Sequence, residues 1–309
     1  MKNINVVILG DNEFAKELGK KGTVTDFTIY NYKGSDMQGG ELTATFLVPT
    51  SYPEKLQSLT HCLAMADAAI LIVKKLDKEL GEYIIALDLL GINKGLIIFD
   101  DYVEKDKFVN LVRGTVLESF IIVDKVPSEI YPRIAKFENK KSEIEHVIID
   151  AAFDVKSVGT VVLGVARGNV NVHDEFGIYP GGKKVTIRSI QVHDKDVKSA
   201  EIGERVGLAL KGVSVEEVER GHLFSKQELK SAKEIEGDFI KNKYYTEEVK
   251  ENSKIFIAAH LQYRQVDVVS VSDGKIKLKS DKDIVIIPGN EYLLLRPEGK
   301  MRIIGKIKV

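Results

Sequence analysis

The sequence contains a single cysteine, Cys62, and this scarcity excludes an intrachain disulfide and a cysteine-rich zinc site. One thiol is typical of a protein kept in a reducing compartment, so we expect a cytoplasmic location. None of the six histidines has a second histidine or a set of carboxylates at metal-binding spacing. The sequence therefore predicts no metal site, no cofactor and no catalytic constellation.

Long apolar runs are also absent. No stretch approaches the roughly 18–20 apolar residues that span a bilayer. The first five residues begin a strand directly and lack the pattern of a signal peptide. We therefore expect no membrane partner.

The chain has almost no net charge, because 45 Lys+Arg stand against 46 Asp+Glu. The chain as a whole is therefore not a basic nucleic-acid binder. The charges are unevenly distributed, however, with a net −5 over residues 1–150 and a net +4 over residues 223–309. The C-terminal third could therefore meet a polyanion, although an excess of this size also fits an ordinary solvated surface.

Strands alternate with helices over roughly the first 140 residues. Apolar and β-branched runs predict strands at residues 5–9, 23–32, 42–48, 69–73, 95–99 and 120–123. Helical spacing predicts helices at residues 11–19, 53–66, 79–90, 105–113 and 127–137, with Asp11 as the N-cap of the first. This alternation favours an α/β domain whose sheet has a largely parallel core.

Only strands follow after that region. Runs at residues 160–163, 175–179 and 185–190 are separated by glycine-containing turns, which favours a small closed β-barrel without unpaired edges. A second barrel is predicted from runs at 235–240, 254–260, 265–271, 275–279, 283–287, 288–297 and 301–307. Ser272-Asp273-Gly274 is a hairpin-turn signal within it. We expect domains at residues 1–142, 143–226 and 227–309.

The first barrel carries several landmarks in one order. They are Gly159-Thr160-Val161, Arg167-Gly168, Val172-His173-Asp174-Glu175, Gly203-Glu204-Arg205-Val206-Gly207 and Glu217-Val218-Glu219-Arg220-Gly221. This order resembles the second domain of the translational GTPases, the family of elongation factor Tu and the selenocysteine-specific factor SelB. The entry segment Asp150-Ala151-Ala152-Phe153 looks closest to archaeal SelB. The resemblance implies a P-loop-GTPase-like α/β domain followed by two all-β barrels.

The first nucleotide-binding motif of that family is degenerate here. A P-loop needs G-x-x-x-x-G-K-[ST], because its glycines let backbone N–H groups wrap the phosphates and its hydroxyl holds magnesium. Counting from Gly10, Ala15 stands at the second glycine, Lys16 at the lysine and Glu17 at the hydroxyl. We expect the Glu17 carboxylate to add negative charge near the phosphate position. Gly10 and Lys16 are then vestigial positions.

The other two nucleotide motifs are missing. The D-x-x-G motif should fall at residues 47–52, but its aspartate and glycine are absent, and Tyr52 aligns roughly with the histidine that follows it. The base-reading N-K-x-D motif should fall at residues 100–103 and is absent too. Three losses predict a pseudo-GTPase rather than an enzyme. An active GTP-dependent elongation factor with an unfamiliar loop is the alternative.

The resemblance also implies a pocket for the 3′ terminal adenosine and aminoacyl end of tRNA on the first barrel. Carried over position by position, it involves Gly159, Val161, Gln191 and Ala209. Gln191 stands in place of the family's adenine-facing glutamate, and Ala209 replaces a leucine that packs on the base. The pocket is therefore either altered or no longer used, and ordinary barrel positions are the competing interpretation.

The sequence thus predicts a translation-factor-like protein without GTP turnover. Its implied partners are tRNA, the ribosome or another translation factor. A protein-binding scaffold that uses the former effector face is a further alternative.

Overall fold

The computed structural model describes residues 2–309. The chain forms two compact units. One unit contains the residues up to Lys140 together with Pro297–Ile304, and the other contains Lys141–Arg296 with Gly305–Val309. The domain boundaries near residues 142 and 226 stay predictions.

The first unit is built on a seven-stranded sheet. Its elements are β1 (Lys2–Leu9), α1 (Ala15–Leu18), β2 (Lys20–Val24), β3 (Thr28–Ser35), β4 (Glu41–Val48), α2 (Leu56–Met65), β5 (Ala68–Val73), α3 (Lys78–Leu89), β6 (Gly95–Phe99), α4 (Lys105–Val112), a 3-10 turn (Val116–Ser119), β7 (Ile121–Ile122) and α5 (Pro127–Ile134). The strand order is β2-β3-β4-β1-β5-β6-β7. β4, β1, β5, β6 and β7 run parallel, whereas β2 and β3 form an antiparallel extension.

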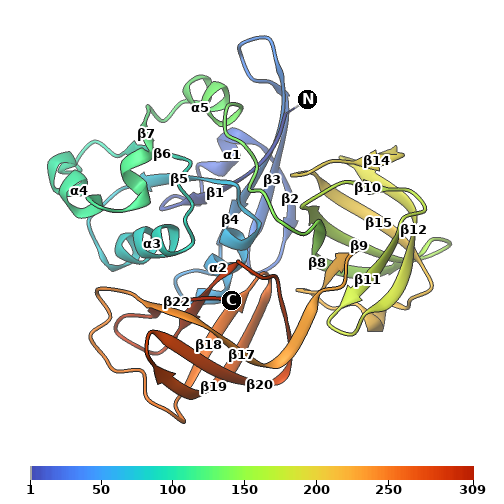
Figure 1. Ribbon diagram of the computed structural model, residues 1–309. Coiled ribbons are helices and arrows are strands. Elements are labelled where there is room, and N and C mark those ends of the chain that lie inside the picture. Colours follow the sequence, from blue (N-terminus) through green and yellow to red (C-terminus); the bar gives the residue numbers. More distant parts are fainter. Residues whose placement is uncertain (1) are drawn as a thin grey trace. The chain divides into compact units, whose positions relative to one another are not determined.

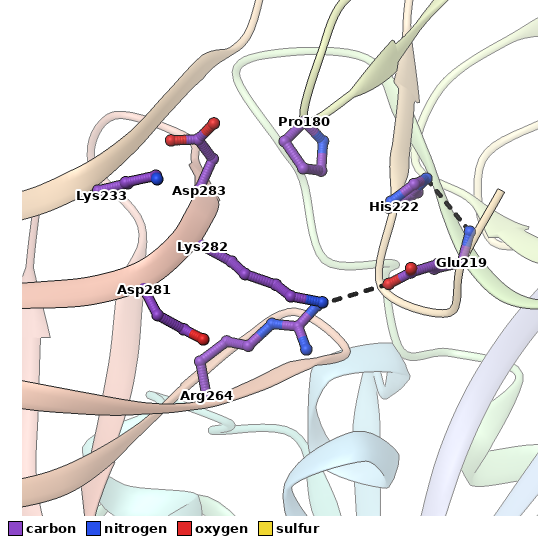
Figure 2. A pocket seen from close by; sticks show the side chains of 8 residues that line it. All are labelled: Pro180, Glu219, His222, Lys233, Arg264, Asp281, Lys282 and Asp283. Carbon is purple, nitrogen blue, oxygen red and sulfur yellow. Dashed lines mark hydrogen bonds and ion pairs between the residues drawn. The ribbon is translucent and has the colours of Figure 1, made fainter. Parts of the chain in front are cut away.

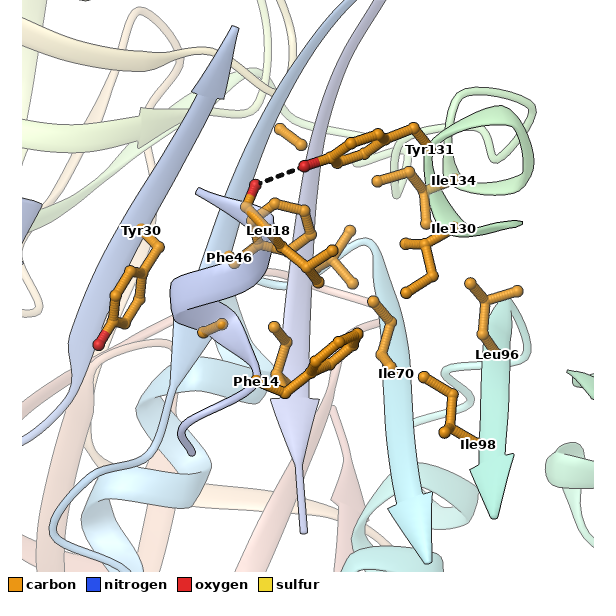
Figure 3. Close-up of a cluster of buried hydrophobic side chains, with 14 of the residues drawn as sticks. Phe14, Leu18, Tyr30, Phe46, Ile70, Leu96, Ile98, Ile130, Tyr131 and Ile134 are labelled. Atoms are coloured by element: carbon orange, nitrogen blue, oxygen red, sulfur yellow. Dashed lines mark hydrogen bonds between the residues drawn. The ribbon is translucent and has the colours of Figure 1, made fainter. Parts of the chain in front are cut away.

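Both faces of the central strands are covered. Along β1, successive side chains from Val6 to Leu9 are all fully buried, which is why this strand is a continuous apolar run rather than an alternating one. On one face, Phe14 at the N-cap of α1, Leu18 of α1 and Ile130 of α5 pack against the sheet, as Figure 3 shows. None of the helices among residues 2–309 has the length and apolar character needed to cross a membrane.

The second unit begins with a closed barrel. Its elements are β8 (His146–Val155), β9 (Gly159–Ala166), β10 (Val170–Asn171), β11 (Glu175–Tyr179), β12 (Lys183–Val192), β13 (Lys195–Val197), β14 (Ser199–Ala200), β15 (Arg205–Lys211), a 3-10 turn (Val215–Glu217) and β16 (Leu223–Ser225). The order is β11-β16-β8-β9-β15-β12, and pairing of β12 with β11 closes the ring (Figure 1). Its core is formed by the inward side chains, Val162 and Leu208 among them.

A second barrel completes the chain. It consists of β17 (Lys230–Lys241), β18 (Lys254–Ala259), β19 (Gln262–Ser272), β20 (Lys275–Ile286), β21 (Glu291–Leu295) and β22 (Ile303–Lys308), closed in the order β17-β20-β19-β18-β21-β22. Asp273 and Gly274 connect β19 to β20 with φ of 51° and 74°. Two left-handed residues are what a two-residue hairpin turn requires, so the predicted turn is confirmed. The predicted fold class, an α/β domain followed by two β-barrels, is confirmed as well.

Two local predictions in the first unit are wrong. Residues 23–32 form not one strand but the hairpin β2–β3, because the Thr25 N–H donates to the Phe27 carbonyl at 2.8 Å and turns the chain. Asp11 does not cap α1, which starts at Ala15 with Phe14 at the cap position and no side-chain cap. The Asp11 carboxylate is instead bound by two lysines, as described below.

Two strand predictions also differ in extent. The run at 120–123 contributes only the two residues of β7 to the sheet. The runs at 275–279 and 283–287 are one strand, β20, because a bulge carries the ladder past the polar residues between them.

Candidate functional site

The carboxyl edge of the parallel strands is the place where open α/β sheets bind ligands. Asp11 follows β1 there, Lys74 follows β5 and Lys125 follows β7. The Asp11 carboxylate accepts Lys125 Nζ at 2.7 Å and lies 3.1 Å from Lys74 Nζ. Three residues that are far apart in the sequence thus form one ion cluster at the edge.

Asp11 is the buried centre of this cluster. Its side chain is only 8% exposed, whereas the two lysine side chains are 40–44% exposed. Burial alone raises the pKa of Asp11, but the hydrogen bonds and positive charges of Lys125 and Lys74 outweigh burial and lower that pKa below its ordinary value. Asp11 is therefore an anion near neutral pH, and it offsets one of the two positive charges at this edge.

The helix that follows is short and packed into the core. α1 has only four residues, so few aligned peptide dipoles point at the edge. Phe14, Ala15 and Leu18 are each at most 1% exposed, and Lys125 Nζ lies 5.1 Å from the centre of the Phe14 ring. Apolar side chains of this segment thus occupy the first unit's core rather than a loop open to a ligand.

The two vestigial positions have structural surroundings of their own. Gly10 has φ +87°, and a Cβ there would stand 2.0 Å from the carbonyl oxygen of Ile72. Packing against β5 therefore requires a glycine at this position. Lys16 forms an ion pair with Glu13, and its side chain is 57% exposed. Glu17 is exposed on the same turn.

A buried polar network adjoins Gly10. The Tyr83 hydroxyl is hydrogen-bonded to the Gly10 backbone, and the Tyr83 and Tyr52 ring centroids are 5.0 Å apart. The Tyr52 hydroxyl donates to Glu82 at 2.7 Å, and Arg302 Nε donates to the same carboxylate at 2.8 Å. Arg302 belongs to the segment Pro297–Ile304, which is part of the same compact unit. The position that aligns with the family's histidine is thus a tyrosine fixed by a buried carboxylate.

The positions expected for base recognition are solvated. Asp100, Asp101 and Tyr102 follow β6 and are exposed, and the Tyr102 side chain is 97% exposed. No group of three or more His, Cys, Asp or Glu side chains in residues 2–309 is placed to hold a metal ion.

The four candidate residues of the first barrel lie on its outer face. Ile190 and Val192 point into the core, so Gln191 between them points outward from β12. Val161 of β9 stands opposite Ala209 of β15, and Gln191 stands opposite Gly207, one outward position further along β15. Gly159 lies two residues before Val161 on the same face. The structure therefore brings the four residues onto three adjacent strands.

This face combines exposed and covered positions. Gln191 is exposed and donates from Nε2 to Asp196 at 3.0 Å, while Ala209 is only 5% exposed. A Cβ on Gly207 would have Leu163 at 3.5 Å and Gln191 at 3.8 Å as its nearest neighbours. The glycine thus leaves a shallow groove between those two side chains.

Sequence reasoning missed three residues of this face. Phe153 of β8 pairs with Val161, and its side chain is 40% exposed. Arg205, two residues before Gly207, forms an ion pair with Asp150 at 2.5 Å. One buried atom of each partner, Asp150 Oδ1 and Arg205 Nη2, has no hydrogen-bond partner in the described chain. The signal was available, since all three residues fall in the landmark segments of the sequence.

An α/β sheet with a ligand-type carboxyl edge, followed by two closed barrels, defines the class of the translation factors. Residues 159–225 match the family model described as elongation factor Tu domain 2. The structure is similar to that of the bacterial selenocysteine-specific elongation factor EF-Sec, with a TM-score of 0.82 at 19% identity, covering 100% of this chain and 58% of that one. It is also similar to SelB of Methanococcus maripaludis in complex with the GTP analogue GPPNHP, with a TM-score of 0.80 at 18% identity and coverage of 100% and 79%.

The chain belongs to the translational GTPase family of elongation factor Tu and SelB. The selenocysteine-specific elongation factor of Methanocaldococcus jannaschii is 26% identical over 328 residues, covering 93% of this chain and 70% of its own. A second protein of that organism, named Uncharacterized protein MJ0325, is 38% identical over 309 residues with 99% of each chain covered. Relatedness to SelB-like elongation factors makes this a translation-factor-like protein.

Proposed function

We propose that this protein binds the aminoacylated 3′ end of tRNA on the outer face of the first barrel and does not turn over GTP. The proposed absence of GTP turnover is supported by the ion cluster of Asp11, Lys74 and Lys125. It supplies from within the chain the negative charge that a nucleotide phosphate would supply from outside.

The Coulomb repulsion between Asp11 and a phosphate gives the size of the expected loss in nucleotide affinity. A phosphate brought to the two lysines also approaches the Asp11 carboxylate, which is an anion at neutral pH. Two like charges about 4 Å apart cost about 4 kcal/mol at an effective dielectric constant of 20. Relative to the same two lysines without Asp11, that energy corresponds to a loss of about a thousandfold in affinity. The absence of a P-loop hydroxyl and of the D-x-x-G aspartate removes both magnesium anchors as well.

The barrel face offers the chemistry that an aminoacylated nucleotide needs. The exposed Phe153 ring provides a surface on which a base can stack, and the Gln191 amide, held by Asp196, provides a hydrogen-bonding edge. Beside Gly207, Asp150 of β8 and Arg205 of β15 form an ion pair whose unpartnered atoms, Asp150 Oδ1 and Arg205 Nη2, are buried. If the pair opens, the oxygen can accept from an ammonium group and the nitrogen can donate to an ester carbonyl. An aminoacyl ester carries both groups.

Binding assays with aminoacylated and deacylated tRNA test this proposal. Phe153→Ala should weaken binding of the aminoacylated form by about tenfold or more, since base–aromatic stacking contributes roughly 1–3 kcal/mol. Gln191→Ala should have a similar effect, because a hydrogen-bonded base edge contributes about as much. Tyr244→Ala removes a 47% exposed aromatic ring from the loop between β17 and β18 and is the matched control.

Three results would argue against the proposal. Equal losses in Phe153→Ala and Tyr244→Ala would mean that the outer face has no special part. Equal affinity for aminoacylated and deacylated tRNA would remove the role of Asp150 and Arg205. An affinity that does not change with salt concentration would contradict phosphate contacts, because each neutralised phosphate releases counterions.

A further inference from the structure

The second barrel has a wide bulge that nothing in the translation-factor proposal uses. In the β17–β20 ladder, Ala232 pairs with Ile284 and Glu234 pairs with Lys279. Residues 280–283 of β20 therefore oppose the single residue Lys233 of β17. The strand carries the exposed sequence Asp281-Lys282-Asp283 through this bulge. Bulges are often placed where a strand must aim side chains at a site.

The bulge forms one wall of a pocket of about 330 Å³ within the second unit. The pocket is lined by Pro180, Glu219, His222, Lys233, Arg264, Asp281, Lys282 and Asp283. Figure 2 shows Arg264 and Lys282 extending from the second barrel toward Glu219 of the first. A volume of this size is at the lower end of the range of small-molecule sites, which is about 300–1,000 Å³.

The two barrels meet closely beside this pocket. Gly221 has φ +91°, and a Cβ there would lie 2.9 Å from the carbonyl carbon of Leu261 and 3.0 Å from Gln262. Backbone from the first barrel thus packs directly on backbone from the second. This contact places His222, the next residue, at a fixed position in the pocket wall.

Arg264 is the least satisfied group in the pocket. Its Nε is buried and has no hydrogen-bond partner in the described chain. Its only ion pair among residues 2–309 is with Glu219 at 3.8 Å, which is beyond hydrogen-bond distance, and the Glu219 side chain is 59% exposed. A planar guanidinium in this state fits a group with two acceptor oxygens, such as a carboxylate or phosphate.

The groups around Arg264 provide both positive and negative charges to the pocket. His222 Nδ1 accepts the Glu219 N–H at 3.3 Å, so the neutral imidazole has its proton on Nε2. Burial lowers the pKa of His222, which keeps this neutral form at physiological pH. Lys282 adds a positive charge, while Asp281 and Asp283 add two exposed carboxylates. The lining therefore offers donors for an oxyanion and acceptors for an ammonium group.

We propose that this pocket binds a small zwitterion, whose phosphate or carboxylate pairs with Arg264 and whose ammonium group meets Asp281 and Asp283. The site is separate from the outer face of the first barrel, so a test of tRNA binding neither supports nor contradicts this proposal. Glu219 competes with the ligand for Arg264. Removing the Glu219 charge should therefore strengthen binding, whereas removing the Arg264 charge should weaken it.

Isothermal titration of the full chain with O-phosphoethanolamine, glycine, inorganic phosphate and ethylamine tests the pocket. The two zwitterions should bind more tightly than either single-charge probe, and their ranking distinguishes phosphate from carboxylate. Arg264→Leu should weaken zwitterion binding by about tenfold or more, the range of a lost charge-assisted hydrogen bond. Glu219→Gln should strengthen it, and Asp283→Asn should weaken the zwitterions without weakening inorganic phosphate.

Arg296→Leu is the matched control, because the Arg296 side chain has a similar exposure of 26% and pairs with Glu247 outside the pocket. Circular dichroism of each variant checks that it folds. No saturable binding of any probe to the folded wild-type chain would overturn the proposal. Equal losses in Arg264→Leu and Arg296→Leu, or weaker binding in Glu219→Gln, would overturn it as well.

Discussion

Replacing Arg302 with methionine should destabilise the first unit strongly. The Arg302 side chain is 11% exposed and donates through Nε to Glu82 at 2.8 Å and through Nη1 to the Pro53 carbonyl at 2.6 Å. Its guanidinium also lies 5.2 Å from the Tyr52 ring centroid. Glu82 is 2% exposed, so Arg302→Met leaves a buried carboxylate without its main countercharge.

The expected loss follows from these contacts. Removing one partner of a buried ion pair typically costs about 3–5 kcal/mol. Glu82 keeps the Tyr52 hydroxyl at 2.7 Å and has Lys78 at 4.0 Å, so the lower end applies. We expect Arg302→Met to lower the free energy of unfolding by about 3 kcal/mol. Replacing both partners, as in Glu82→Leu with Arg302→Met, should cost much less than the sum of the single changes, because neither charge is then stranded.

Amide hydrogen exchange of α3 measures this loss in the unit concerned, since a chain with two units need not unfold in one step. Arg296→Met is the control, because its partner Glu247 is 52% exposed, and an exposed pair contributes less than about 1 kcal/mol. A loss in Arg302→Met no larger than in the control would refute the reasoning. Additive losses in the double variant would refute it too.

Three further predictions concern stability. The pKa of His146 is lowered by burial to about 4, so the unfolded chain binds the extra proton first, and up to about 3 kcal/mol should be lost as pH falls from about 6.5 to 4. Urea titrations across that range should show a flatter pH dependence in His146→Gln, and equal slopes would contradict the assignment. Gly221→Ala should cost at least about 2 kcal/mol, because both φ and the close Leu261 backbone oppose a Cβ. Gly289 has φ +80° but open space around its Cα, so Gly289→Ala should lower the free energy of unfolding by less in the same assay. Equal losses in the two variants would show that the Leu261 contact does not contribute. Asp11→Ala should lower the thermal midpoint by leaving two lysines without their anion, a loss of about 1–2 kcal/mol, whereas an unchanged midpoint would show that the cluster contributes nothing.

Much of the fold could be predicted from the sequence, because each strand and helix leaves a local signal. The apolar run of β1 and the Asp273-Gly274 turn are both such signals, and both match the structure. The β2–β3 hairpin was missed because its turn, Thr25-Asp26-Phe27, contains neither glycine nor proline. Its signal is tertiary, since Asp26 is fixed by His61 Nδ1 at 3.1 Å from a helix that comes much later.

In the candidate sites too, sequence motifs identify individual positions, whereas the tertiary structure determines which residues they contact. Gly10 was identified from its motif, but its structural reason is the approach of Ile72, which no local pattern reveals. Lys125 follows Asp11 by 114 residues, and only the order of the parallel strands brings them together. The expectation that Glu17 repels phosphate stays a prediction, because a motif alignment gives the position of a residue in the sequence but not the direction of its side chain.

Isothermal titration with GTP and magnesium at high-micromolar protein tests the proposed loss of nucleotide chemistry. If Asp11 holds Lys74 and Lys125 as the internal counterion, the titration should show no saturable heat, and the protein should release no phosphate above background. A micromolar dissociation constant for GTP accompanied by phosphate release would contradict that proposal.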